Sequence, residues 1–305
     1  MLIVTNGDSA AFAMQQAGIS DEILPWRDVL HDGPVPETDS LDALSRIRAQ
    51  FVADCGWGSF EETHRSFRHR DERLASVRAD DEIVLWFEHD LYDQLQLIQV
   101  LDWFERGSPP RTFTLICHDE FISESSHDLI QARFASRVPV TDNQLALSHR
   151  AWSAFRSDTP EHMAELCAQE MSALPFLRNA VIRLLQEFPG VDDGLARSER
   201  QILAVVRGGA KDRRLVFRQL QELEEAKYLG DWSFDRYVDG LMRPPLPLLT
   251  APEGSRSLAL TATGEAVLAG DLDWVATVNM DKWIGGVHLR PSALWRWTGE
   301  AAVRD

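Results

Sequence analysis

The run EIVLWFEH at residues 82–89 constrains the fold of this chain more than any other feature. A continuous apolar run of this length is typical of a strand buried on both faces, as in a parallel sheet. It is followed by an amphipathic helix pattern at residues 91–107 and by a second apolar run, TFTLIC, at residues 112–117. Because parallel neighbours need a crossover between them, this order predicts a β-α-β unit.

The same alternation starts at the first residue. MLIVTN at residues 1–6 and EILPWRD at residues 22–28 predict two further strands, and residues 9–18 and 40–56 have helical patterns. Apolar strands that alternate with helices are typical of a parallel sheet covered by helices. The sequence therefore predicts a Rossmann-like α/β domain over residues 1–125.

Two further regions follow this domain. Residues 126–189 have helical patterns and end at a Pro-Gly pair. Residues 190–305 show a helix, a turn, a second helix and a strand pair, which predicts a winged-helix-like domain with an aromatic C-terminal tail. The tail segment WIGGVHL at residues 283–289 is expected to be a strand that packs on the first domain, or else to help cover a site there.

Composition excludes several classes of protein. No stretch approaches the roughly 20 uncharged apolar residues that a membrane helix needs. The N-terminus lacks the basic start of a signal peptide, so we expect a cytoplasmic protein. The three cysteines are far apart, which excludes a disulfide framework and a zinc site made of cysteine pairs. Of the net charge of −17, residues 1–189 carry −15, so nucleic acid is a poor partner for this part.

The turn NGDS at residues 6–9, between the first strand and the first helix, is the first candidate site. Backbone N–H groups converge at such a turn, which suits a phosphate or another anion. Alternatively, Gly7 only makes the turn, and Asp8 or Ser9 caps the helix. The block also resembles that of GDSL-type hydrolases, in which Ser9 would be the nucleophile. In that family the catalytic acid and base lie in a D-x-x-H block near the C-terminus. Here the matching block lies at residues 28–31, directly after the second predicted strand.

Polar residues also follow the second and third strands. Arg27 could bind a carboxylate or phosphate through two hydrogen bonds, and Asp28 could orient His31 as a base. The alternative is a rigid loop held by an ion pair and ending in Gly-Pro. After the third strand, Glu88 could orient His89 in the same way.

The helix after the third strand begins with a cluster of polar side chains, including Asp90, Asp93 and Gln94. Carboxylates in a first turn suit the helix dipole, which is an ordinary structural reason for them. A divalent metal held by Glu88, His89 and Asp90 is an alternative. Because neighbours on a strand point to opposite faces, we expect no metal there.

The carboxyl ends of parallel strands lie at one edge of a sheet, where ligands of open α/β sheets bind. We therefore expect one crevice lined by Asn6 or Ser9, by Arg27 or His31, and by Glu88 or His89. Nearby acids should partly neutralise Arg27, so a bound anion would also need N–H groups of the Gly7 turn. The expected catalytic residues are His31, His89, Asp28 and Glu88, and the expected ligand-binding residues are Asn6, Gly7, Asp8, Ser9, Arg27, Asp90 and Gln94.

The winged-helix-like region carries cations that could bind DNA. Arg213, Arg214 and Arg218 lie on its second helix, but that helix continues into the acidic run ELEE at residues 222–225, which would repel phosphates. One alternative function is therefore a regulator that senses a ligand through the α/β domain and binds DNA through these arginines. Another is a protein-interaction scaffold without chemistry.

Three N-terminal blocks resemble bacterial domain-of-unknown-function family 1835: VTNGDSAA at 4–11, LPWRDVLHDGPV at 24–35 and LWFEHDLYDQLQL at 85–97. The terminal WIGGVHL and WRW are similar to longer members of that family. The resemblance covers essentially the whole chain. It implies that the chain has relatives in this family, but it implies no particular reaction, so no catalytic residue can be assigned from the family to this sequence. The residues themselves favour a protein that binds, and could hydrolyse or transfer, a small polar or phosphate-bearing ligand. They predict no particular cofactor.

Overall fold

The apolar runs of the N-terminal half form the central sheet of a mixed α/β fold in the computed structural model, which describes residues 1–107, 110–251 and 257–305. The strand order is β2-β1-β4-β5-β6, and the first four are parallel, so the predicted parallel sheet is confirmed. The antiparallel β6 lies beyond residue 125, the predicted end of the domain. The strands are β1 (Leu2–Thr5), β2 (Glu22–Pro25), β4 (Glu82–Phe87), β5 (Thr112–Cys117) and β6 (Val138–Pro139).

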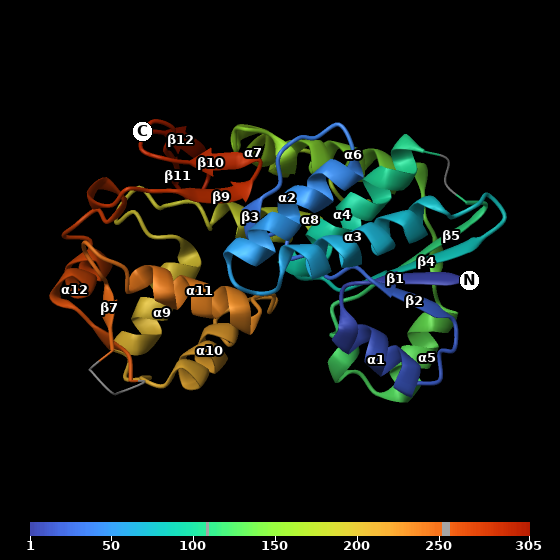
Figure 1. The fold of residues 1–305 in the computed structure, drawn as a ribbon, viewed down its shortest axis with the longest axis horizontal. Helices are drawn as coiled ribbons and strands as arrows, with labels where there is room; N and C mark the ends of the chain where they lie inside the picture. Colours follow the sequence, from blue (N-terminus) through green and yellow to red (C-terminus); the bar gives the residue numbers. More distant parts are fainter. Residues whose placement is uncertain (108–109, 252–256) are drawn as a thin grey trace.

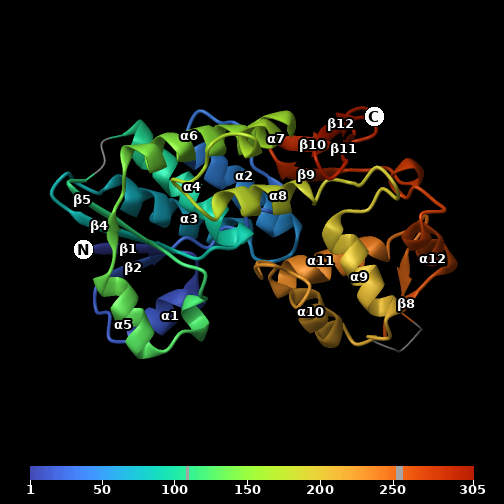
Figure 2. The same cartoon turned by 180° about the vertical axis from the view of Figure 1, so that it is seen from behind.

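Helices cover both faces of the sheet (Figures 1 and 2). Ile3 points to one face, where it belongs to a core shared with α1 (Asp8–Gln16) and α5 (His127–Ala135). Leu85 points to the other face and shares a core with α4 (Leu91–Arg106). The other helices of that side are α2 (Leu41–Asp54), α3 (Phe60–Ala75), α6 (Asp142–Arg156), α7 (Glu161–Cys167) and α8 (Leu177–Leu185).

The segment predicted to be helical, residues 126–189, holds α5 to α8 but also contributes β6 to the sheet. Its longest helix, α6, starts at a capping box. The hydroxyl of Thr141 accepts from the Gln144 N–H, and the Gln144 side chain accepts from the Thr141 N–H. This helix packs against α4 and α7, so it joins the sheet layer to the rest of the segment.

The C-terminal half continues with three helices, a hairpin and a fourth helix. A single bridge also pairs Asp212, the N-cap residue of α10, with Ser257. None of the helices in the described parts of the chain is long and apolar enough to cross a membrane. The elements are α9 (Arg197–Arg207), α10 (Arg213–Gln221), α11 (Asp231–Leu241), β7 (Leu249–Thr250), β8 (Ala259–Leu260) and α12 (Ala262–Ala269), with short 3-10 turns at η1 (Ile122–Glu124) and η2 (Val275–Thr277).

The tail returns to the N-terminal half, which confirms the expectation that a C-terminal strand packs on the first domain. Strand β9 (Lys282–Gly285) pairs parallel with β3 (Gly33–Pro34) and antiparallel with β10 (Val287–Leu289). The two-residue strand β3 lies in the polar loop after β2. That loop is therefore fixed by a segment about 250 residues away in sequence (Figure 1). A last hairpin joins β11 (Trp295–Trp297) and β12 (Ala302–Arg304).

Candidate functional site

A cavity of about 800 Å³ opens at the carboxyl ends of β1 and β2. A second part of its wall comes from α2, α3 and the turn between them, and a third from residues 228–233, at and before the start of α11. The cavity thus lies between the sheet domain and the C-terminal half, at the sheet edge where open α/β sheets bind ligands. Six predicted site residues line it: Asn6, Gly7, Asp8, Ser9, Arg27 and His31.

The N-terminus of α1 meets this cavity at Gly7. Gly7 is the N-cap residue, in extended conformation with φ −169°, and no side chain caps the helix. Neither Asp8 nor Ser9 therefore plays the capping role considered from the sequence. A Cβ added at Gly7 would meet no atom of the described residues within 4 Å. The N–H groups of the first turn are left without a side-chain acceptor, an arrangement that suits anions at helix N-termini.

Arg27 lies against the same turn through a two-point ion pair. Its Nε donates to Asp8 Oδ2 at 2.9 Å, and its Nη2 donates to Asp8 Oδ1 at 2.7 Å. These hydrogen bonds raise the pKa of Arg27 and lower the pKa of Asp8. The expected partial neutralisation of Arg27 is confirmed. An anion in the cavity would therefore depend on the N–H groups of the Gly7 turn as well.

The backbone of Arg27 has φ 57°, in the left-handed region that side chains other than glycine rarely adopt. We expect Arg27→Gly to have a free energy of unfolding about 1 kcal/mol higher than Arg27→Ala. Glycine adopts this positive φ without steric strain, whereas the Cβ of alanine keeps the strain. Both variants lose the Asp8 ion pair, so the comparison isolates the backbone. Urea unfolding of the two variants measures the difference, and an equal or lower value for Arg27→Gly would contradict the expectation.

His31 is buried beside the cavity. Its ring lies edge-on to the rings of Tyr92 and Tyr228, with centroids 6.0 and 5.0 Å away. Neither ring nitrogen has a hydrogen-bond partner among the described residues, and Nε2 lies 4.0 Å from Asp32 Oδ2. Burial lowers the pKa of His31, which favours the neutral imidazole. Both ring nitrogens are buried, so neither is accessible to take a proton from a ligand in the cavity. His31 contributes the surface of its ring to the cavity wall.

Asp28 does not orient His31, contrary to the role suggested by the sequence. Its Oδ1 instead accepts from Arg48 Nε at 3.0 Å, and both side chains are fully buried. The other guanidinium nitrogens of Arg48 donate to the carbonyls of Val29, Asp32 and Pro34. Arg48 therefore holds the loop after β2. The sequence signal for it was a charged residue on the apolar face of α2, one turn after Leu44.

Glu88 and Gln94 lie outside the cavity. Glu88 Oε1 accepts from the N–H of Ile122 at 2.7 Å, which turns the carboxyl toward η1. The Gln94 amide donates to the Glu88 carbonyl at 2.7 Å and to Cys117 Sγ at 3.4 Å. Both residues thus connect the end of β4 with neighbouring elements instead of facing a ligand at β1 and β2.

His89 and Asp90 line a separate cavity of about 260 Å³ that also includes residues of α8. The His89 ring packs near the rings of Phe121 and Phe176, with centroids 5.2 and 5.9 Å away. The predicted convergence of three strand ends is therefore correct for β1 and β2 and wrong for β4. Glu88 and His89 instead turn toward η1 and α8, a direction that strand spacing alone does not predict.

Three buried carboxylates gather behind Asn6. Oxygens of Glu88, Asp90 and Asp93 lie within 4.8 Å of one another, and Asn6 Nδ2 donates to Asp93 Oδ2 at 2.8 Å. Burial, followed by the neighbouring carboxylates, raises the pKa of Glu88 to about 8 and that of Asp90 to about 7. Such a cluster must share protons or hold a divalent cation. His89, which the sequence suggested as a metal ligand, is not part of it.

These raised pKa values predict that stability falls as pH rises. The unfolded carboxyls lose their protons near pH 4, whereas the folded ones keep them to about pH 7 for Asp90 and about pH 8 for Glu88. Each group then lowers the free energy of unfolding by up to about 1.4 kcal/mol per pH unit between those limits. We expect Glu88→Gln to flatten this slope above pH 5 and to be more stable than the wild type at pH 8.

Urea unfolding at several pH values measures the slope. Glu82→Gln is the matched control, because Glu82 begins the strand that Glu88 follows but pairs with Arg137 at 2.9 Å. A slope that is the same in Glu88→Gln as in the wild type and the control would show that Glu88 already ionises normally in the folded protein.

Aromatic side chains that the sequence analysis did not single out form much of the remaining cavity wall. The rings of Trp57 and Trp232 lie 6.0 Å apart at 30°, and Trp232 is 56% exposed. A tryptophan among polar residues, as in GDWSFD at residues 230–235, was the signal that could have identified it. The aromatic wall consists of Trp57, Phe67, Tyr92, Tyr228 and Trp232.

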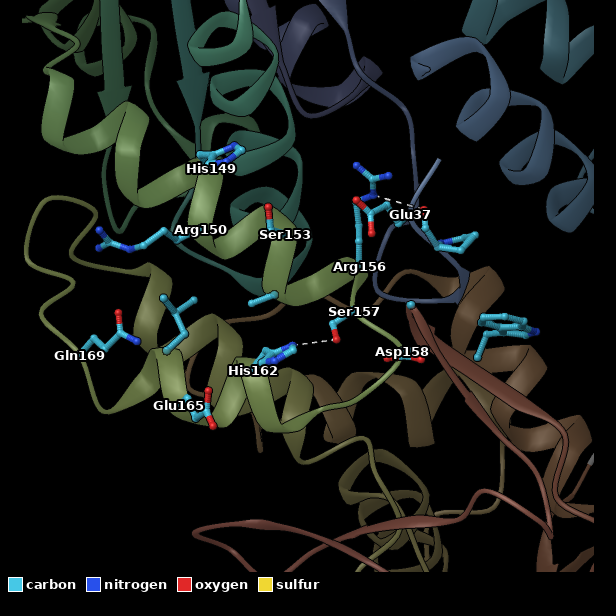
Figure 3. A pocket seen from close by; sticks show the side chains of 15 residues that line it. Glu37, His149, Arg150, Ser153, Arg156, Ser157, Asp158, His162, Glu165 and Gln169 are labelled. Atoms are coloured by element: carbon cyan, nitrogen blue, oxygen red, sulfur yellow. Dashed lines mark hydrogen bonds between the residues drawn. The ribbon is translucent and has the colours of Figure 1, made fainter. Parts of the chain in front are cut away.

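A second large cavity, of about 870 Å³, lies between α6, α7 and the tail (Figure 3). Ser157 and His162 point toward one another in it, with Oγ 2.9 Å from Nδ1. The same hydroxyl accepts from the Thr159 N–H at 3.2 Å, so it shapes the turn after α6. The carbonyl end of α6 would disfavour an alkoxide at Ser157. We therefore interpret this pair, which the sequence analysis missed, as a structural part of the turn and not as a nucleophile with its base.

The arginines expected to contact DNA are not equivalent. Arg213 pairs with Asp235 at 2.8 Å and with Asp239 at 2.6 Å, both on α11. Arg214 and Arg218 are exposed on α10. The cationic patch is thus reduced to two side chains, because the aspartates of α11 already neutralise the third.

Comparison with protein-family models finds no family that matches this chain, and comparison with curated proteins finds no match either. The resemblance to family 1835 therefore stays a prediction. Function has to be argued from the site itself.

Proposed function

We propose that this protein binds a small polar or phosphate-bearing molecule in the cavity at the ends of β1 and β2. The observation that carries the proposal is the convergence of Gly7, Arg27 and His31, from two different strand ends, on one cavity. Its volume, about 800 Å³, is in the range of small-molecule sites. A scaffold without a ligand would have no need to keep these polar groups around an open space.

The anionic end of the ligand would lie at the N-terminus of α1. The uncapped first turn supplies N–H donors, and Arg27 supplies a positive charge that its pairing with Asp8 holds in place. Ser9 adds a hydroxyl on the same side of the cavity. These groups suit a phosphate or a carboxylate of modest charge.

Binding is better supported than hydrolysis or transfer. A general base must come within hydrogen-bond reach of the proton it removes, and both nitrogens of His31 are covered. His89 and Glu88 lie outside the cavity, so they cannot take that role on a ligand held there. The proposal is therefore limited to recognition of the ligand.

We further propose that residues 1–125 are Rossmann-like, because their sheet is mostly parallel. We propose that residues 190–305 are winged-helix-like, because α9 to α11 are followed by the β7–β8 hairpin. The cations expected to contact DNA lie on α10, and aspartates of α11 pair with one of them, Arg213. Here α11 carries Asp231, Asp235 and Asp239, and its first residues line the cavity. Its charge and position favour a ligand-binding wall over a DNA-binding surface.

A thermal-shift screen against nucleotides and sugar phosphates tests the proposal. A ligand at 100 times its Kd should stabilise the wild type by about 2.7 kcal/mol. We expect much less stabilisation in Gly7→Val, which fills the turn without backbone strain, and in Arg27→Gln. Arg73→Gln is the matched control, because Arg73 makes a similar two-point pair with Glu22 outside the cavity.

The control should respond to the ligand as the wild type does. If no compound stabilises the wild type more than Gly7→Val and Arg27→Gln, the cavity is not a site for this class of ligand.

A further inference from the structure

The cavity at the ends of β1 and β2 is lined by two chemically different sets of groups. Gly7 and Arg27 supply donors and charge, whereas the aromatic wall defined above supplies ring surface, part of it at Tyr92 and Tyr228 beside His31. A ligand that uses both sets must combine an anionic group with a surface that packs on aromatic rings. A sugar phosphate alone has no flat ring to pack there.

Trp232 is the side chain most available for such contact. It is 56% exposed at the start of α11, although indole is a large apolar group that normally gains from burial. Its one ring neighbour among the described residues is Trp57, which is tilted by 30°. Ring surface of the indole therefore stays available for stacking, both in this cavity and in an adjoining one of about 840 Å³ that Trp57 and Trp232 also line. Flat heterocycles stack on aromatic side chains whatever their substituents, because every base has a π face.

Acidic and hydroxyl groups also line the cavity. They are Glu62, Thr63 and Ser66 of α3 and Asp231, which precedes Trp232 in the chain. Carboxylates accept hydrogen bonds, so they suit the N–H edge of a heterocycle and disfavour an anionic group. The anionic group of the ligand therefore fits best at Gly7 and Arg27, and its ring fits best beside Asp231 and Trp232.

We infer that the ligand is a nucleoside phosphate, with its base stacked on Trp232 and its phosphate at the Gly7 turn. This inference rests on the proposed function, since it identifies the ligand class of the same cavity. The base is expected to carry an amino group that donates to Asp231 or Glu62. The phosphate is the group that Gly7 and Arg27 recognise.

Isothermal titration with adenosine monophosphate, adenosine and ribose 5-phosphate tests the inference. Trp232→Leu should weaken binding of the two adenine compounds by about tenfold or more and leave ribose 5-phosphate unchanged. Gly7→Val should weaken the two phosphates and affect adenosine least. Phe12→Leu is the matched control, because Phe12 is 63% exposed and lies outside the cavity wall.

The outcomes separate the two proposals. If ribose 5-phosphate binds as tightly as adenosine monophosphate and Trp232→Leu changes neither, the ring inference is wrong while the anion site stands. If none of the three compounds binds the wild type, both proposals fail for this class of ligand. Unfolding of Trp232→Leu in urea should match that of the wild type, which shows that lost binding is not lost folding.

Discussion

Arg48→Met is expected to lower the free energy of unfolding by about 3–5 kcal/mol, the usual cost of removing one partner of a buried ion pair. The Arg48 side chain is fully buried, and its Nε donates to Asp28 at 3.0 Å. Three loop carbonyls also accept from it. Methionine matches much of its volume but leaves the Asp28 carboxylate buried without a cation. The loop after β2 would lose the contacts that shape one wall of the cavity.

The matched control is Arg46→Met, on the exposed face of the same helix. We expect a loss of at most about 1 kcal/mol there, because Arg46 is exposed and its guanidinium lies over the Phe60 ring at 5.7 Å, a contact of about 0.5–1 kcal/mol at an exposed site. Urea unfolding followed by circular dichroism compares the two variants. Equal losses would mean that helix propensity, and not the buried pair, dominates the effect.

Gly286→Ala is expected to lower the free energy of unfolding by about 3 kcal/mol or more, since it forces two backbone segments apart. A Cβ at this position would overlap the backbone carbonyl group of Arg156 and lie 2.5 Å from the backbone carbonyl oxygen of Ser157. The Gly286 N–H also donates to the Phe155 carbonyl at 3.0 Å, which satisfies the end of α6. The tail would therefore have to move off the helix on which it packs.

Gly240→Ala is the control for this substitution. A Cβ at Gly240, in α11, would meet no atom within 4 Å in the part of the chain that the structure describes. Alanine also favours helix more than glycine does. Stability should stay unchanged or rise slightly. Differential scanning calorimetry compares the two variants with the wild type, and a small loss in Gly286→Ala would show that the tail contact contributes little to folding.

The parallel sheet was predictable because its strands are continuous apolar runs, as at residues 82–87. The strands β3 and β6 were not, since two residues give no periodicity. Their pairing depends on partners far away in sequence, including β9 for β3. Apolar periodicity along the sequence therefore identifies the main strands and helices of the fold, but not the short strands that pair with distant segments.

The sequence predicted the position of a candidate site residue only where the direction of the strands determines that position. Gly7 and Arg27 follow parallel neighbours, so they had to lie at one edge of the sheet. The direction of the Glu88 side chain depends on the Ile122 N–H, which belongs to a separate segment. The aromatic wall comes partly from residues 228–233, and no local pattern places that segment against the sheet.

The most direct measurement is a crystal structure grown with the screened compound that raises the melting temperature most. We predict density in the cavity at the ends of β1 and β2, with an anionic group beside the Gly7 turn and Arg27. Density only in the cavity between α6 and α7, or only beside His89, would contradict this prediction.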